Sequence, residues 1–247
     1  MIYKKGMIQI AKQTIFTNGS DFEYIVMGSK SPAIILINGA GGPIEGWSKV
    51  WGKLGRENVV FAYNRLGIGK SSKPKEPQTG IVMVRDLKGI LLNLKVEPPY
   101  LIVGHSLGGL VAHLFALTYP EDVCGIVFLE SSTIQDVLAN RKKEKIRGQS
   151  DFSEVSHVLS TINQIQAFSV FPDIPISVIA GGKPAFAWLM PKAIKEGRMN
   201  HQKALLSLSR RGNVVIAKKS GHFPQLIQPD LVIHEINSLL DKISTDS

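Results

Sequence analysis

Short apolar runs rich in β-branched residues recur along the chain and alternate with longer segments of helical periodicity. This alternation predicts an α/β fold with a doubly wound, mostly parallel sheet. The runs are apolar on both faces, which is typical of strands covered by helices on each side. They are FEYIVM (22–27), AIILIN (33–38), NVVFAY (58–63), YLIVG (100–104), GIVFLE (125–130), ISVIAG (176–181) and NVVIAK (213–218).

Helical segments fill the intervals between these runs. The clearest is 229–243, which a proline opens and whose apolar residues recur with a helical period. Since 247 residues with 44% hydrophobic content can bury a substantial core, we expect a single domain over residues 1–247. A small, mostly helical cap insertion is expected at 131–175, where the chain has no clear strand. The other helix candidates are 82–94, 106–118 and 184–210, the last with a break near Pro191.

The formal net charge of +9 raises the question of a polyanionic partner. The densest basic cluster is RKKEKIR at 141–147, but the surrounding segment 133–173 has five basic and five acidic side chains. This balance is typical of a solvated helical face. Because no zinc-finger spacing, aromatic RNA-binding motif or phosphate loop accompanies the cluster, we expect no nucleic-acid partner.

The distribution of apolar residues also bears on location. No stretch approaches the roughly 18 consecutive apolar residues of a membrane-spanning helix, so no membrane span is expected. The first residues, MIYKKGMIQIAKQ, lack an apolar segment followed by a small-residue cleavage site, and a cytoplasmic location is therefore predicted. The single cysteine, Cys124, is interpreted as a small buried hydrophobe, since alone it forms no internal disulfide and no multi-cysteine metal site.

The stretch VGHSLGG (103–109) is the most informative motif. It supplies G-x-S-x-G through Gly104, Ser106 and Gly108, between the strand YLIVG and the helical segment LGGLVAHLFALT. Strand, tight turn and helix are the context of a nucleophile elbow. Side chains at the two glycines would clash with the adjoining elements, and the turn would project Oγ at the carboxyl edge of the sheet, where α/β sheets bind ligands. Ser106 is therefore predicted to be a nucleophile, with a purely structural serine-glycine turn as the alternative.

Three further loops accompany the elbow, and together the four motifs resemble the α/β-hydrolase fold superfamily over nearly the whole chain. ILINGAGGP (35–43) is similar to the family's oxyanion loop, with Asn38 where histidine is commoner. YNRLGIGKSS (63–72) is similar to its aspartate-arginine loop, with Asn64 in place of the acid, and KSGHFPQLIQPD (219–230) is similar to its histidine loop. The resemblance is nearest to small-capped, esterase-like serine hydrolases, in which an acid-Ser-Ser follows the sixth strand.

The glycine-rich loop suggests where a tetrahedral oxyanion would bind. Its amide at Ala40, together with the amide of Leu107 after the serine, is predicted to donate to that oxyanion. Such turns also occur for structural reasons, so this prediction depends on the pairing with the elbow. Asn38 is expected to hydrogen-bond its own loop, with substrate contact as the alternative. Arg65 is expected to anchor the loop that it begins.

Six histidines are candidates for the general base. His222 follows the strand NVVIAK by a short connection, which places it at the same sheet edge as Ser106 and favours it as the base. Because no histidine pair has metal-ligand spacing with a carboxylate, and serine chemistry needs neither metal nor cofactor, we expect neither. The other histidines are interpreted as structural groups, or as residues of the insertion and the helix after it: His105, His113, His157, His201 and His234.

The third member of a triad follows from chain order, since in this fold the acid lies between the serine and the histidine. Glu130 ends a strand on the correct side of the sheet, whereas the usual position after the seventh strand, AGGKPAF (180–186), has no carboxylate. Glu130 is therefore the predicted acid, with Asp136 as the fallback and a degraded triad as a further alternative. The other seven carboxylates are interpreted as solvated or badly placed: Glu121, Asp122, Glu144, Asp151, Glu154, Asp173 and Glu196.

These residues predict a serine hydrolase that cleaves a small ester or related acyl substrate through an acyl-enzyme. The alternative of a different class is a small-molecule sensor on a hydrolase scaffold, which would signal to a protein partner. Amide, lactone, carbon-carbon bond and acyl-transfer chemistry use nearly the same groups. The substrate is expected to be a small acyl or aromatic molecule. The predicted pocket walls, which also suit simple packing, are Val158, Leu159, Ile162, Ile165, Phe168, Phe171 and Trp188.

Overall fold

The computed structural model describes residues 11–140, 151–183 and 192–246. The strands are β1 (Gln13–Thr17), β2 (Ser20–Met27), β3 (Ala33–Ile37), β4 (Val60–Tyr63), β5 (Tyr100–His105), β6 (Val123–Leu129), β7 (Ile176–Gly181) and β8 (Gly212–Ala217). The α-helices are α1 (Trp51–Leu54), α2 (Gly80–Asn93), α3 (Leu107–Thr118), α4 (Ile134–Asn140), α5 (Val158–Gln166), α6 (Lys192–Ala204), α7 (Pro224–Ile227) and α8 (Pro229–Asp246). Short 3₁₀ helices are η1 (Ile44–Trp47), η2 (Pro120–Asp122) and η4 (Leu205–Leu208).

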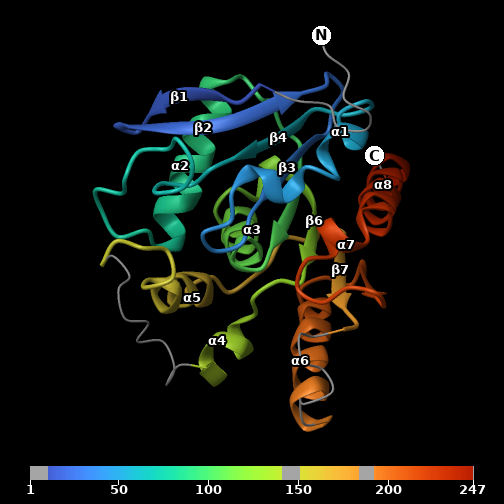
Figure 1. Ribbon diagram of the computed structural model, residues 1–247. Coiled ribbons are helices and arrows are strands. Elements are labelled where there is room, and N and C mark those ends of the chain that lie inside the picture. Colours follow the sequence, from blue (N-terminus) through green and yellow to red (C-terminus); the bar gives the residue numbers. More distant parts are fainter. Residues whose placement is uncertain (1–10, 141–150, 184–191, 247) are drawn as a thin grey trace.

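One eight-stranded sheet organises the described residues, in the order β1-β2-β4-β3-β5-β6-β7-β8. The strands β1, β2 and β4 pair antiparallel, and every pair from β4 to β8 is parallel. The helices α2, α3 and α5 cover one face of this sheet, and α1 and α8 cover the other (Figure 1). The predicted doubly wound, mostly parallel α/β sheet is therefore confirmed.

Alternate side chains of the central strands enter two separate hydrophobic cores. Ile35 and Ile37 pack with α2, α3 and α5, whereas Ile34 and Leu36 pack with η1, α1 and α8. This alternation follows from the two-residue period of a strand. It explains why the central strands are apolar throughout, since both faces of the sheet are covered.

Most sequence-predicted elements occur within two or three residues of their expected bounds. The strand β1, at an antiparallel edge, was not predicted, because its partly exposed residues QTIFT lack a fully apolar run. The predicted helix at 184–210 contains α6 and η4, and its first part, 184–191, lies outside the described residues. The segment 131–175 contributes α4 and α5, while 141–150 also lies outside the described residues. The single-domain organisation with a cap stays a prediction.

Candidate active site

The loop between β5 and α3 forms a sharp turn centred on Ser106. This residue has φ 52° and ψ −121°, a backbone conformation that side-chain-bearing residues rarely adopt. A Cβ at Gly104 would lie 2.5 Å from the Gly108 carbonyl oxygen, and a Cβ at Gly108 would lie 2.3 Å from that of Ile37. Both glycines are therefore required by close backbone approach, as the motif predicts.

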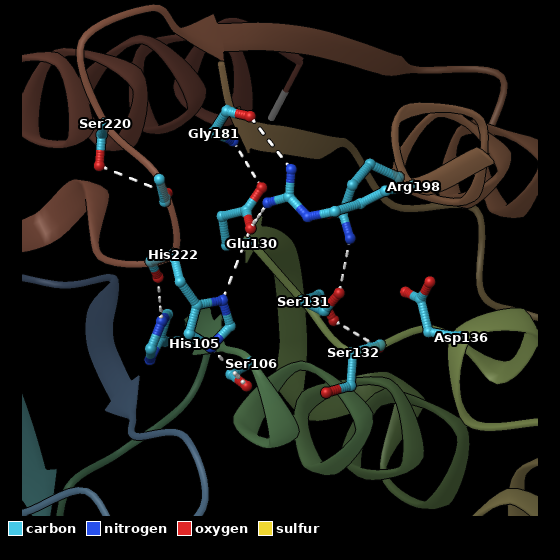
Figure 2. A network of polar contacts seen from close by, with 12 residues as sticks. His105, Ser106, Glu130, Ser131, Ser132, Asp136, Gly181, Arg198, Ser220 and His222 are labelled. Atoms are coloured by element: carbon cyan, nitrogen blue, oxygen red, sulfur yellow. Dashed lines mark hydrogen bonds and ion pairs between the residues drawn. The ribbon is translucent and has the colours of Figure 1, made fainter. Parts of the chain in front are cut away.

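The histidine loop after β8 brings His222 to the serine. Its Nε2 lies 3.1 Å from Ser106 Oγ, within reach for proton transfer. The ring of His105 lies beside His222 in Figure 2. Its Nε2–H donates to the His222 carbonyl oxygen at 2.7 Å. Because a carbonyl oxygen only accepts, this bond requires the proton of His105 on Nε2. His105 thus supports the backbone of the histidine loop, consistent with the structural role predicted for it.

Glu130 directly follows β6 and lies beside His222. Its backbone amide donates to Ile179 O at 2.8 Å, and its side chain is buried. Oε1 accepts the Gly181 amide at 2.5 Å, while Oε2 lies 3.5 Å from His222 Nδ1. Figure 2 shows the imidazole between the carboxylate of Glu130 and the hydroxyl of Ser106. The structure thus brings together the three predicted triad residues.

Arg198 of α6 is a second partner of the same carboxylate, and nothing in the sequence singled it out. Its Nη2 donates to Glu130 Oε2, and its Nη1 donates to Gly181 O at 3.3 Å. Burial by itself would raise the pKa of Glu130. The contacts from His222, Arg198 and the Gly181 amide outweigh burial and hold this pKa below its ordinary value, which favours the carboxylate form.

Asp136, the fallback acid, lies away from the histidine. Its carboxylate accepts a hydrogen bond from the hydroxyl of Thr133 at 2.7 Å and lies 2.6 Å from Nδ1 of His201. Figure 2 shows it on the far side of Ser131 and Ser132 from His222. Among the two proposed acids, the geometry therefore favours Glu130.

The two predicted oxyanion donors belong to segments that adjoin the serine. Leu107 is the first residue of α3, where helical amides have no acceptor within the helix. The loop that contains Ala40 runs against the elbow, since a Cβ at Gly39 would lie 3.0 Å from Ser106 Cβ. The role of these two amides stays a prediction.

Arg65 was expected to anchor the loop that it begins, but its side chain contacts the oxyanion loop and Glu154 instead. The buried guanidinium donates to Asn38 O at 2.8 Å and to Gly39 O at 2.7 Å. Its Nε donates to Glu154 Oε2 at 2.5 Å and its Nη2 donates to Oε1 at 3.0 Å. The interpretation of Glu154 as a solvated residue of the insertion is wrong, because its carboxylate is buried between Arg65 and the Gly41 amide.

Asn38 and Asn64 stand where the family commonly has a histidine and an acid, and both side chains are buried. The Asn38 side chain is buried, and its Nδ2 has no hydrogen-bond partner in the part of the chain that the structure describes, so this amide does not donate the expected loop hydrogen bond there. Asn64, which stands where the family has an acid, accepts the Ile44 amide at 2.8 Å and donates to Glu23 Oε2 at 2.7 Å. Asn64 thus joins β4 to β2 and to the start of η1.

Three of the predicted pocket walls in the insertion lie in the hydrophobic core instead. Val158, Ile162 and Ile165 are buried in the core shared with α2 and α3, which matches the packing alternative for these residues. Trp188 lies outside the described residues. A cavity of about 80 Å³ adjoins the elbow helix and was not foreseen. Its lining includes Gly109, His113, Phe128, Ser131, Ser132, Ile134 and Leu205.

The described residues form neither a metal-binding cluster nor a membrane-spanning helix. Across 11–140, 151–183 and 192–246, no three or more His, Cys, Asp or Glu side chains gather as a metal site would require. Within the same ranges, every helix is too short or too polar to cross a membrane.

Comparisons with known proteins agree with this architecture. The sequence model of the alpha/beta hydrolase fold family matches residues 32–172, more than half of the chain. An uncharacterized protein, YqjL, of Bacillus subtilis (strain 168) is 26% identical over 213 residues, a match that covers 83% of this chain and 82% of that protein. Uncharacterized mycobacterial proteins are 33% identical over 108 residues, and the match spans only 31% of their length and 44% of this chain.

Solved structures resemble the chain over nearly its whole length. A thermophilic esterase from Thermogutta terrifontis has a TM-score of 0.69 at 19% identity, and the match covers 96% of this chain and 99% of that chain. The serine hydrolase CarC, involved in carbazole degradation, has a TM-score of 0.68 at 20% identity, with 94% and 99% covered. At this identity the likeness concerns the fold. With the family match, it establishes that the chain belongs to the α/β-hydrolase fold family.

Proposed function

We propose that the protein is a serine hydrolase that cleaves a small carboxylic ester or related acyl substrate through an acyl-enzyme. The observation that carries this proposal is the position of His222, with Nε2 3.1 Å from Ser106 Oγ and Nδ1 facing the Glu130 carboxylate. Nucleophile, base and orienting acid in this order form the arrangement by which serine hydrolases act. The structural likeness to an esterase and to a serine hydrolase supports the same chemistry.

The acylation step uses each group once. His222 Nε2 accepts the Ser106 proton while Oγ attacks the substrate carbonyl carbon. The resulting oxyanion accepts hydrogen bonds from the amides of Ala40 and Leu107. As the tetrahedral intermediate collapses, the carbon-oxygen bond of the ester breaks, and the imidazolium gives its proton to the departing alcohol. Glu130 holds the ring and stabilises its protonated form.

Deacylation repeats the sequence with water. His222 removes a proton from the water, the hydroxide attacks the acyl carbon, and the acyl-oxygen bond to Ser106 breaks. The proton returns to Oγ, and a carboxylic acid leaves. No step requires a redox change, and every proton that moves passes through His222 Nε2.

The test compares three variants on short-chain aryl esters. Ser106→Ala should abolish turnover and labelling by a fluorophosphonate, and Glu130→Gln should lower kcat by two to four decades, since losing an orienting acid costs about 10⁴ in a well-studied serine protease. Asp136→Asn is the matched carboxylate control and should retain activity. Full turnover in Ser106→Ala would refute the nucleophile, and full turnover in Glu130→Gln alone would refute the acid.

A further inference from the structure

One buried ion pair, Arg65 with Glu154, holds the oxyanion loop at three successive peptide groups. Arg65 donates from Nη1 to the Asn38 carbonyl oxygen and from Nη2 to the Gly39 carbonyl oxygen. Glu154 Oε1 accepts a hydrogen bond from the amide of Gly41, two residues after Gly39, at 2.7 Å. The predicted oxyanion donor, Ala40, lies between these fixed points.

The geometry of the peptide bond connects Arg65 to the Ala40 amide. The Gly39 carbonyl and the Ala40 N–H belong to the same peptide unit, whose six atoms lie close to one plane. This bond is trans, because the cis bonds of the described residues are Ser31-Pro32 and Pro98-Pro99. In a trans unit the carbonyl and the N–H point in opposite directions, so a guanidinium that fixes Gly39 O also fixes the direction of the Ala40 N–H.

Glu154 completes this arrangement from the insertion. Arg65 and Glu154 are almost fully buried, with side-chain exposures of 3% and 10%. Burial would raise the pKa of Glu154, but Arg65 and the Gly41 amide outweigh it and hold this pKa below its ordinary value. A buried pair of this kind often contributes little net stability compared with apolar residues. Its geometry, with three contacts to one short loop, points instead to a role in placing that loop.

We propose that Arg65 and Glu154 are positioning residues that aim the Ala40 amide at the oxyanion, so that one residue of the insertion, Glu154, helps to build the catalytic site. This inference rests on the proposed function, because it concerns the oxyanion of that reaction. Neither side chain touches the reacting atoms. Their effect is therefore expected on the transition state more than on substrate binding.

The experiment measures Glu154→Ala and Glu154→Gln with short-chain aryl esters, after active sites are titrated with a fluorophosphonate. Loss of one oxyanion donor costs about 10² to 10³ in kcat, so a misdirected donor should cost about 10- to 100-fold in Glu154→Ala. KM should stay within about threefold. Glu154→Gln keeps an oxygen acceptor for Gly41 and should recover part of the loss. Inhibition by an alkylboronic acid, which forms a tetrahedral adduct with the serine, should weaken by the same factor as kcat/KM.

Asp122→Asn is the matched control. It removes another partly buried ion pair, in which Lys88 Nζ lies 2.5 Å from Asp122 Oδ2. Asp122 directly precedes β6, whereas Glu130 of the candidate site directly follows it. This variant should lower the melting temperature without changing kcat per active site. A stability effect alone would therefore not imitate the predicted result.

Two failures can be told apart. If the wild-type protein hydrolysed no ester and were not labelled by a fluorophosphonate, the proposed function would be refuted, and this inference with it. An active wild type with Glu154→Ala unchanged in kcat per active site, or changed only in KM, would refute the inference alone. Should Glu154→Ala fail to fold, Glu154→Gln is judged by the same two criteria, with unchanged kcat and boronic acid affinity counting against the inference.

Discussion

Ser106 and Glu130 follow neighbouring strands, β5 and β6, and both have a positive backbone φ, 52° and 43°. For residues with a side chain this conformation is uncommon and costs free energy. It occurs here at two positions where the chain turns at the carboxyl edge of the sheet, and at Asn18 and Lys95 outside the site. The strain therefore coincides with the residues proposed as nucleophile and acid.

Ser106→Gly is expected to stabilise the fold while abolishing activity. Glycine adopts φ 52° and ψ −121° without a Cβ clash, so the free energy of unfolding should exceed that of Ser106→Ala by about 1–2 kcal/mol. Urea denaturation of the two inactive variants measures the difference. Equal midpoints would show that the elbow stores no strain at this residue.

Arg198→Met should destabilise the protein because it removes a cation from the buried Glu130 carboxylate. Removing one partner of a fully buried pair costs about 3–5 kcal/mol, and the partial exposure of Arg198 reduces the expectation to about 1–2 kcal/mol. The cost should largely disappear in a Glu130→Gln background, which a double-mutant cycle in urea would reveal. An undiminished cost in that background would assign the effect of Arg198 to contacts other than Glu130.

Stability should fall as pH drops from 6.5 towards 4, partly through His113. Burial lowers the pKa of this histidine to about 4, and its ring packs edge-on against Phe128 and Phe171. A lowered folded-state pKa means that the unfolded chain binds the proton more tightly. The stabilising contribution is thus complete above the unfolded pKa and is lost as pH falls, by about 1.4 kcal/mol per pH unit within this window.

The variant His113→Phe tests this pH dependence. Phenylalanine keeps the aromatic contacts and has no titratable nitrogen, so the loss of stability between pH 6.5 and 4.5 should shrink by about 2–3 kcal/mol. Urea midpoints at several pH values provide the comparison. A slope identical to that of the wild type would mean that the pKa of His113 is the same in the folded and unfolded states.

Gly108→Ala and Gly197→Ala should have opposite effects. A Cβ at Gly108 would meet the backbone carbonyl oxygens of Ile37 and Asn38 at 2.3 and 2.6 Å, which should cost about 1–3 kcal/mol and much of the activity. Among the described residues, a Cβ at Gly197, within α6, has no atom within 4 Å outside the helix and should stabilise it by about 0.5–1 kcal/mol. Thermal unfolding of both variants distinguishes packing at the elbow from simple helix propensity.

Sequence patterns close to each residue were enough to predict Ser106, His222 and Glu130 as members of one site. The elbow is specified by glycines within two residues of Ser106, and His222 and Glu130 each follow a strand whose carboxyl end lies at the same edge. Periodicity, chain order and strand direction suffice to bring such residues together. The same reasoning recovered every strand except β1, whose exposure pattern reflects its place at the sheet edge.

Residues that depend on contacts between distant segments were missed. Glu154 lies 89 residues beyond Arg65, and Arg198 lies 68 residues beyond Glu130. In the sequence both are charged residues of polar stretches, and solvation is the ordinary expectation for them. Their burial depends on where the insertion and α6 dock against the sheet, which neither spacing nor periodicity encodes.

The Arg65–Glu154 pair also bears on exchanging insertions between related proteins. A transplanted segment without a carboxylate at this place would leave a guanidinium, 3% exposed, facing two carbonyls with no counter-charge. The replacement would then disturb the loop beside the nucleophile even if every contact of the new segment with the substrate were well chosen. Altering specificity by such grafts is therefore a coupled design problem, in which the segment 131–175 and residue 65 must be changed together.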